Sequence, residues 1–181
     1  MKSINKKWKI VHSQPIYGEP FPLYEETVKL PDGETIKYAV NRSKDAAAVL
    51  LVPKEGDVLL TYQYRFPIDS WIYDLPGGKV NAGESPKATA IRECIEETGY
   101  KPKKIKKLVS YYMRPGRSDG MLHIFFSNEM EKVSGRQTSS VERVQERIVR
   151  KEKLDDLLKR GAIVDPTLLI AWHTAKFYGY V

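Results

Sequence analysis

Four glutamates and one arginine gather in a short stretch near the middle of the chain. The stretch runs from Gly78 to Tyr100, GKVNAGESPKATAIRECIEETGY, and its charged residues of interest are Glu84, Arg92, Glu93, Glu96 and Glu97. With about 3.6 residues per helical turn, Glu93 and Glu97 would lie one above the other, with Glu96 beside them. Like charges at these spacings destabilise an isolated helix by roughly a few tenths of a kcal/mol per pair unless cations neutralise them. Carboxylate oxygens are ligands that suit Mg²⁺ or Mn²⁺.

A solvated acidic helix face is the simpler interpretation of three glutamates within five residues. The surrounding spacing argues against it, because the stretch matches Gly-x5-Glu-x7-Arg-Glu-U-x-Glu-Glu-x-Gly-U, where U is apolar. Its seven identities are Gly78, Glu84, Arg92, Glu93, Glu96, Glu97 and Gly99. If each identity arose by chance at about 5–10%, the joint match would be rarer than roughly one in ten million per window. The stretch therefore resembles the Nudix box, with Cys94 and Tyr100 at U positions where larger aliphatic residues are usual.

The resemblance implies a fold and a set of metal ligands. The fold is of the α/β class, a Nudix-type α/β/α sandwich with a mixed β-sheet, here with an added N-terminal β-hairpin or sheet segment. Glu93 and Glu97 would be metal ligands, Glu96 would join them or act through water, and the carbonyl of Gly77 would supply another ligand. A bound Mg²⁺, or Mn²⁺, would polarise diphosphate oxygens and lower the pKa of a bound water.

The same resemblance implies catalytic roles outside the ligand set. Arg92 and Glu84 would brace the loop against the helix. The general base is usually carried on a late acidic loop ahead of the last strand, where this chain has only Glu142 and Glu146, four residues apart. Glu146 aligns better, beside Ile148. Both stay open as candidates, and a solvated loop charge is the alternative for each.

Outside the box, the chain is similar to the ADP-ribose pyrophosphatase branch. Gln63-Tyr64-Arg65 followed by Leu75-Pro76-Gly77-Gly78 resembles that branch's Gln-Tyr-Arg and Leu-Pro-Ala-Gly segments, with Asp74 where glutamate is common. A proline 16 residues beyond the closing glycine marks the branch, and Pro115 lies 16 residues after Gly99. The similarity implies hydrolysis of ADP-ribose to AMP and ribose 5-phosphate, with other nucleoside diphosphate sugars as the nearest alternative.

Arg65 is the first candidate for contacting substrate, because a guanidinium offers a planar fork of donors to phosphate or ribose oxygens. A surface charge on a strand is the alternative. The remaining substrate-binding candidates are Tyr64, Arg114, Pro115, Ser118 and Asp119. Tyr64, Trp71 or Tyr112 could stack on a base, although aromatic residues near strands more often belong to a core.

The elements that must position these residues follow from periodicity and turn residues. Alternating apolar residues on either side of Pro31-Asp32-Gly33 predict a hairpin. The apolar run Ala46–Val52 predicts a buried strand that pairs with 57–65. Ser85 and Pro86 predict a helix start and Gly99 its end, with Cys94 as a small buried side chain. Two further helices, one before Gly161 and one after Asp165-Pro166, are expected to cover a sheet.

Composition fits one soluble domain. The chain has 181 residues, of which 41% are hydrophobic and 29% charged, and a net charge of +7 that favours anionic ligands. The basic run Lys101–Lys107 is interpreted as a solvated connector. The run Ala46–Val52 is too short to span a bilayer, no signal peptide is visible, and the single Cys94 suits a reducing compartment. We therefore expect a cytoplasmic protein of nucleotide metabolism with no membrane association.

Residues 1–45 form the predicted N-terminal β segment and 46–181 the Nudix hydrolase domain, with the similarity to the branch covering about 46–178. By resemblance, the N-terminal segment forms a homodimer whose two subunits build the adenosine pocket. Two rival functions remain. A ligand-sensing domain without turnover would be favoured by loss of the paired glutamates, but Glu96-Glu97 is intact. An RNA-processing hydrolase would need a continuous basic groove, whereas the lysines are scattered among acids, so nucleic acid is not expected as a partner.

Overall fold

A computed structural model of the chain describes residues 7–53, 56–133 and 144–181. The chain divides into two compact units. One unit consists of Met1–Lys44 and Tyr112–Met121, and the other of Asp45–Tyr111 and Leu122–Val181.

The first unit is built on a three-stranded antiparallel sheet in the order β1-β2-β3. Its strands are β1 (Lys9–Tyr17), β2 (Leu23–Lys29) and β3 (Thr35–Asn41). The predicted hairpin is confirmed: β2 and β3 pair with Val28 opposite Ile36, and the amide of Gly33 donates to the carbonyl of Leu30 at 3.0 Å. Gly33 has φ +98°, a conformation that glycine adopts without a steric penalty.

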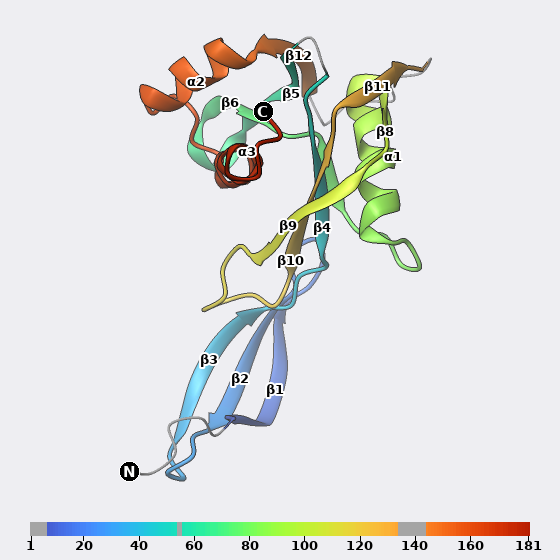
Figure 1. Cartoon of the computed structure of the whole chain (residues 1–181). Helices are drawn as coiled ribbons and strands as arrows, with labels where there is room; N and C mark the ends of the chain where they lie inside the picture. The colour runs from blue at the N-terminus through green and yellow to red at the C-terminus, as the bar shows by residue number, and fades with distance from the viewer. Residues whose placement is uncertain (1–6, 54–55, 134–143) are drawn as a thin grey trace. The chain divides into compact units, whose positions relative to one another are not determined.

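The second unit contains a seven-stranded mixed sheet (Figure 1). Its strands are β4 (Ala46–Leu51), β5 (Asp57–Arg65), β6 (Ser70–Asp74), β7 (Gly77–Lys79), β9 (Lys106–Tyr112), β10 (Met121–Ser127) and β12 (Val144–Arg150). The main order is β12-β5-β4-β10-β9, with β6 beside β5 and β7 beside β4. β4 runs parallel to β10 and antiparallel to β5, so the sheet is mixed, as predicted.

Helices cover both faces of this sheet (Figure 1). The helices are α1 (Pro86–Thr98), α2 (Lys151–Lys159) and α3 (Pro166–Phe177), with a 3-10 turn η1 (Phe66–Ile68) after β5. Ala90 and Cys94 of α1 pack against one face, together with Leu59. Leu154 and Trp172, from α2 and α3, pack against the other. The predicted α/β/α sandwich is thereby confirmed. In the parts of the chain that the structure describes, no helix is long and apolar enough to cross a membrane.

The lysines of Lys101–Lys107 are exposed to solvent, as predicted, but the interpretation of the run as a connector is wrong. Most of the run lies in β8 (Tyr100–Lys103) and at the start of β9. β8 pairs antiparallel with β11 (Glu129–Lys132), and Lys103 Nζ lies 2.7 Å from Glu131 Oε2. Pro102 is buried while the lysines on either side of it are exposed. This alternation is that of a half-buried strand, which the high lysine content conceals.

Candidate active site

The glutamate-bearing helix α1 begins and ends at the predicted residues. Ser85 Oγ accepts the amide N–H of Ala88 at 3.2 Å, and Pro86 occupies the first helical position. Gly99, with φ +75°, donates its N–H to the carbonyl of Ile95 at 2.8 Å. The local sequence therefore fixes both ends of the element that carries the acidic cluster.

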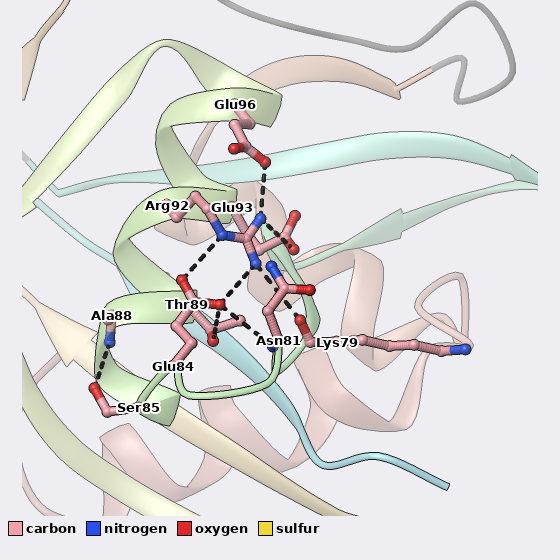
Figure 2. A network of polar contacts seen from close by, with 9 residues as sticks. All are labelled: Lys79, Asn81, Glu84, Ser85, Ala88, Thr89, Arg92, Glu93 and Glu96. Atoms are coloured by element: carbon pink, nitrogen blue, oxygen red, sulfur yellow. Dashed lines mark hydrogen bonds and ion pairs between the residues drawn. The ribbon is translucent and has the colours of Figure 1, made fainter.

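Arg92 is the centre of this cluster (Figure 2). Its Nε donates to Glu84 Oε1 at 3.0 Å and its Nη2 to Glu84 Oε2 at 3.1 Å, a two-pronged pairing with the loop before the helix. Its Nη1 lies 2.8 Å from Glu93 Oε1 and 2.9 Å from Glu96 Oε2. The carboxylates raise the pKa of Arg92 above its usual range, Glu84 most of all. One guanidinium thus holds three carboxylates together.

Glu84 fastens the loop to the helix. Its Oε2 also accepts Thr89 Oγ1 at 2.8 Å and the amide of Asn81 at 3.4 Å (Figure 2). The Arg92 hydrogen bonds, followed by that from Thr89, lower the pKa of Glu84 to about 2. The predicted bracing by Arg92 and Glu84 agrees with this geometry. Thr89, which is fully buried, was not foreseen, although its position five residues after Glu84 is a usable signal.

Two consecutive glycines bring the main chain against the other glutamates. The amide of Gly77 donates to Glu97 Oε2 at 2.9 Å. A β-carbon on Gly78 would stand 2.4 Å from Glu93 Oε1, and one on Gly77 would stand 2.5 Å from the carbonyl of Ala47. Only glycine allows these approaches without a shift. The second of them is a physical reason for glycine at 77, where alanine is common in the branch.

The chemistry of this donor set fits a hard divalent cation. Glu93, Glu96 and Glu97 offer carboxylate oxygens beside the main chain of Gly77. Among residues 7–53, 56–133 and 144–181, no three acidic, histidine or cysteine side chains converge as a ready ligand set. Glu93 and Glu96 instead bind Arg92, which supplies the positive charge that close carboxylates need. Cation binding would therefore require these two side chains to redirect their oxygens.

Further polar residues lie on the face of the second unit's sheet that α1 covers. Leu59 packs with Ala90 and Cys94 of α1, and alternate residues of a strand share a face. Thr61 therefore lies on the α1 side, and so does Glu146, its partner across the β5–β12 pairing. Glu146 lies within β12 and is partly buried, so its prediction as a loop residue is wrong. Glu142 lies outside the described residues.

Arg65 lies on the same face of β5 and pairs with a buried acid. Its Nη2 donates to Asp74 Oδ2 at 2.6 Å, while 46% of its side chain is exposed. Burial first, and then the nearby Asp165, raise the pKa of Asp74 to about 7 against the opposing effect of Arg65. Tyr64, at the neighbouring position, turns to the other face, where its hydroxyl donates to Asp69 at 2.5 Å and its ring lies 6.1 Å from that of Trp71.

The remaining substrate-binding candidates belong to the first unit. They are Arg114, Pro115, Ser118 and Asp119. The amide of Asn41 donates to the carbonyl of Arg117 at 2.8 Å, and Arg42 Nη1 donates to Asp119 Oδ2 at 2.8 Å. Arg42 also binds the buried Glu26. The segment that carries these candidates is therefore fastened to β3, a relationship between distant residues that the sequence offers no means to predict.

Cys94 is buried among α1 and sheet residues, as predicted. Burial raises the pKa of its thiol to about 12, with a smaller opposing effect from the hydrogen bond to Thr98. A thiol that stays protonated is a poor nucleophile. The chemistry of this site therefore belongs to the carboxylates and arginines. Together, the fold and the cluster define a class of α/β/α domain in which one helix presents carboxylates beside two consecutive glycines of a strand.

Comparison with known proteins identifies that class. The family model described as NUDIX domain matches residues 42–171. An ADP-ribose pyrophosphatase of Bacillus subtilis (strain 168) is 36% identical over 159 residues, covering 88% of this chain and 84% of that protein. A methanol dehydrogenase activator of Bacillus methanolicus is 34% identical over 68% of each chain. The crystal structure of an ADP compounds hydrolase matches 97% of this chain and 98% of its own with a TM-score of 0.77, and at 20% identity the likeness concerns the fold. The chain belongs to the Nudix family of hydrolases.

Proposed function

We propose that this chain hydrolyses the diphosphate of ADP-ribose to AMP and ribose 5-phosphate with the help of Mg²⁺, for which Mn²⁺ can substitute. The similarity to the ADP-ribose pyrophosphatase of Bacillus subtilis, which is 36% identical over a stretch that covers 88% of this chain, supports ADP-ribose as the substrate. Glu93, Glu96, Glu97 and the carbonyl of Gly77 would hold the cation. When bound, the cation supplies Lewis acidity, which offsets charge on the diphosphate and acidifies water.

The observation that carries this proposal is the arginine-centred cluster. Arg92 holds Glu93 and Glu96 together while Glu97 is fixed by the amide of Gly77. Acidic groups assembled at this density cost stability when nothing neutralises them. Such an arrangement suits cation binding, and Glu84 keeps Arg92 in place from the loop side. A ligand-sensing domain without turnover would have no need of this complete set.

Glu146 is our first candidate for the group that takes a proton from the attacking water. Its position opposite Thr61, on the side of the sheet that faces α1, supports that role. A carboxylate here would accept the proton as the water attacks phosphorus. Glu142 remains the second candidate. Arg65 would bind phosphate or ribose oxygens, since much of its guanidinium-bearing side chain is exposed. Tyr64, Arg114, Pro115, Ser118 and Asp119 remain proposed substrate contacts.

A substrate panel tests the proposal. ADP-ribose, other nucleoside diphosphate sugars, dinucleotides and capped RNA would be incubated with the protein, with and without Mg²⁺, and the products separated. We expect ADP-ribose to give the highest kcat/KM, with AMP and ribose 5-phosphate as products. Preference for another nucleotide sugar would favour the nearest alternative. Tight binding of ADP-ribose without products would favour a sensor, and cleavage of capped RNA alone would favour RNA processing.

We further propose that the protein is a homodimer formed through β1. Every residue of β1 is exposed, and large apolar residues on it and beside it, including Trp8, Ile10, Ile16 and Tyr17, are more than half exposed. Apolar residues grouped in this way favour a protein partner, and a second copy is the partner our proposal names. Sedimentation of an Ile10→Glu, Ile16→Glu variant should yield monomers. Lys9→Glu, at an already polar position of the strand, should leave the dimer intact.

The compartment we propose is the cytoplasm. A single buried cysteine suits a reducing environment. Localisation of the tagged full chain by fractionation would test this, and recovery in a membrane or secreted fraction would contradict it.

A further inference from the structure

Asp74 is a buried carboxylate that contacts functional groups on two segments of the site. Only 6% of the residue is exposed. It lies at the end of β6, paired across the sheet with Thr61 of β5, and therefore on the face that carries Gln63 and Arg65. It directly precedes Leu75 and Pro76, the two residues that connect β6 to β7.

Both carboxylate oxygens of Asp74 accept hydrogen bonds. Oδ2 accepts Arg65 Nη2 at 2.6 Å and Gln63 Nε2 at 3.1 Å. Oδ1 accepts the amide of Leu75 at 2.7 Å, and the main-chain carbonyl of Asp74 accepts Thr61 Oγ1 at 3.2 Å. A buried charge requires such a set of partners, because an unsatisfied one would be strongly destabilising. The position of the carboxylate is therefore closely defined.

The consequence for Arg65 is a restricted guanidinium. An unrestrained arginine on a strand surface samples many rotamers, and fixing it in one of them costs side-chain entropy. Here the bond from Nη2 to Asp74 fixes one edge of the guanidinium, while 46% of the side chain remains exposed. A substrate would then meet a group whose orientation is already set.

The second consequence concerns the main-chain segment that leads into the two glycines of β7. Asp74 Oδ1 holds the amide of Leu75, two residues before Gly77, whose own amide donates to Glu97. Arg65 and the glutamate-bearing helix are therefore both hydrogen-bonded to the same short segment of chain, Arg65 through Asp74 and the helix through Gly77. Displacing the Asp74 carboxylate would change the orientation of Arg65 first, because that contact is made by a flexible side chain and not by the backbone.

We propose that Asp74 is a positioning residue that orients Arg65 to bind the diphosphate-linked substrate and fixes its place relative to the segment from Leu75 to Gly78. This inference rests on the proposed substrate-binding role of Arg65. Asp74 does not itself touch substrate. Because its effect on turnover passes through the arginine, replacing Asp74 should lower turnover only when Arg65 is present. Replacing a purely structural residue should have the same effect with or without Arg65.

A double-mutant cycle measures how far the effect of replacing Asp74 depends on Arg65. kcat and KM for ADP-ribose would be determined for the wild type, Arg65→Ala, Asp74→Asn and the double variant, at mildly alkaline pH so that Asp74, with its pKa of about 7, is ionised. We expect Arg65→Ala to lower kcat/KM by about tenfold or more, the loss typical of a hydrogen bond to a charged group. Asp74→Asn should also lower it, yet the double variant should be no worse than Arg65→Ala. Additive losses would overturn the proposal.

Further variants distinguish positioning of Arg65 from a general effect on stability. Asp74→Glu keeps the charge and should lose less than Asp74→Asn, again only when Arg65 is present; this cycle decides the matter if the asparagine variant does not fold. Asp155→Asn removes a carboxylate that binds Trp172 and Lys176, and should lower the melting temperature without changing kcat/KM. If Arg65→Ala has wild-type kcat/KM while Glu97→Gln is inactive, the proposed role of Arg65 fails and the metal-site proposal stands.

Discussion

Gly78 lies directly against the carboxylate of Glu93: a β-carbon on residue 78 would stand 2.4 Å from Glu93 Oε1. The obstructed atom is the end of a flexible side chain, so the fold can accept a methyl group there by moving the carboxylate. A methyl group there would occupy space that the carboxylate of Glu93 needs in order to turn toward a cation beside the main chain of Gly77.

Gly78→Ala should therefore reduce turnover far more than stability. We expect kcat/KM for ADP-ribose to fall by about a hundredfold, the loss typical of a misplacement near 1 Å, while the melting temperature changes little. Gly18→Ala is the matched control, since a β-carbon there has no atom within 4 Å among the described residues. An active Gly78→Ala variant would mean that the position of Glu93 is unimportant.

Mg²⁺ should raise the melting temperature of the wild type more than that of a Glu93→Gln, Glu97→Gln variant. Ligands that bind only the folded protein stabilise it by mass action, by about 2.7 kcal/mol at a hundred times Kd. Thermal melts across a Mg²⁺ titration measure the difference. A variant with Glu152 and Asp156 of α2 neutralised should respond like the wild type. Equal shifts for all three proteins would show that the ions bind elsewhere.

Local signals predicted the helix that carries the site, and long-range pairing explains what was missed. Ser85 and Gly99 act on their own neighbours, so the bounds of α1 could be predicted from the sequence. Glu146 was assigned to a loop because its place in β12 depends on pairing with β5, far away in sequence. Asp74 was noted only for its residue type, since its burial and its bond to Arg65 depend on how β6 pairs with β5.

Glu146→Gln should lower kcat by about a hundredfold or more and leave KM and the Mg²⁺ dependence nearly unchanged, because a general base acts only in the transition state. Glu142→Gln should then have little effect. If the two results are exchanged, Glu142 is the base. Losses below about threefold in both variants would exclude this region as the source of the base. Reaction in ¹⁸O-labelled water would identify the phosphorus atom attacked, from the product that carries the label.

Asp74 should make stability fall as pH rises toward neutrality. Its pKa is raised to about 7 by burial and by Asp165, so between its ordinary value of 3.8 and about 7 the folded state binds more protons than the unfolded state. The free energy of unfolding contributed by this group therefore falls with rising pH across that window and levels off above it. The charged or titratable groups that act with it are Arg65, Asp165 and Tyr111.

Urea unfolding of wild type and Asp74→Asn at several pH values tests this expectation. Asparagine resembles the protonated acid and does not titrate, so the difference in unfolding free energy between the two proteins should change between pH 5 and about 7. The wild type should lose stability relative to the variant as pH rises. A difference that is constant with pH would show that Arg65 balances the effect of burial, and a change in the opposite direction would show that Arg65 outweighs it.

Hydrolysis of ADP-ribose by wild type and Glu97→Gln across a Mg²⁺ titration tests the central claim most directly. A glutamine oxygen can still accept the Gly77 amide that now binds Glu97 at 2.9 Å, so the fold should persist, but an uncharged amide is a poor ligand for a hard cation. We predict Mg²⁺-dependent release of AMP and ribose 5-phosphate by the wild type, and nearly complete loss of turnover in a folded Glu97→Gln protein. Wild-type rates for Glu97→Gln at ordinary Mg²⁺, or equal wild-type rates with and without a chelator, would contradict it.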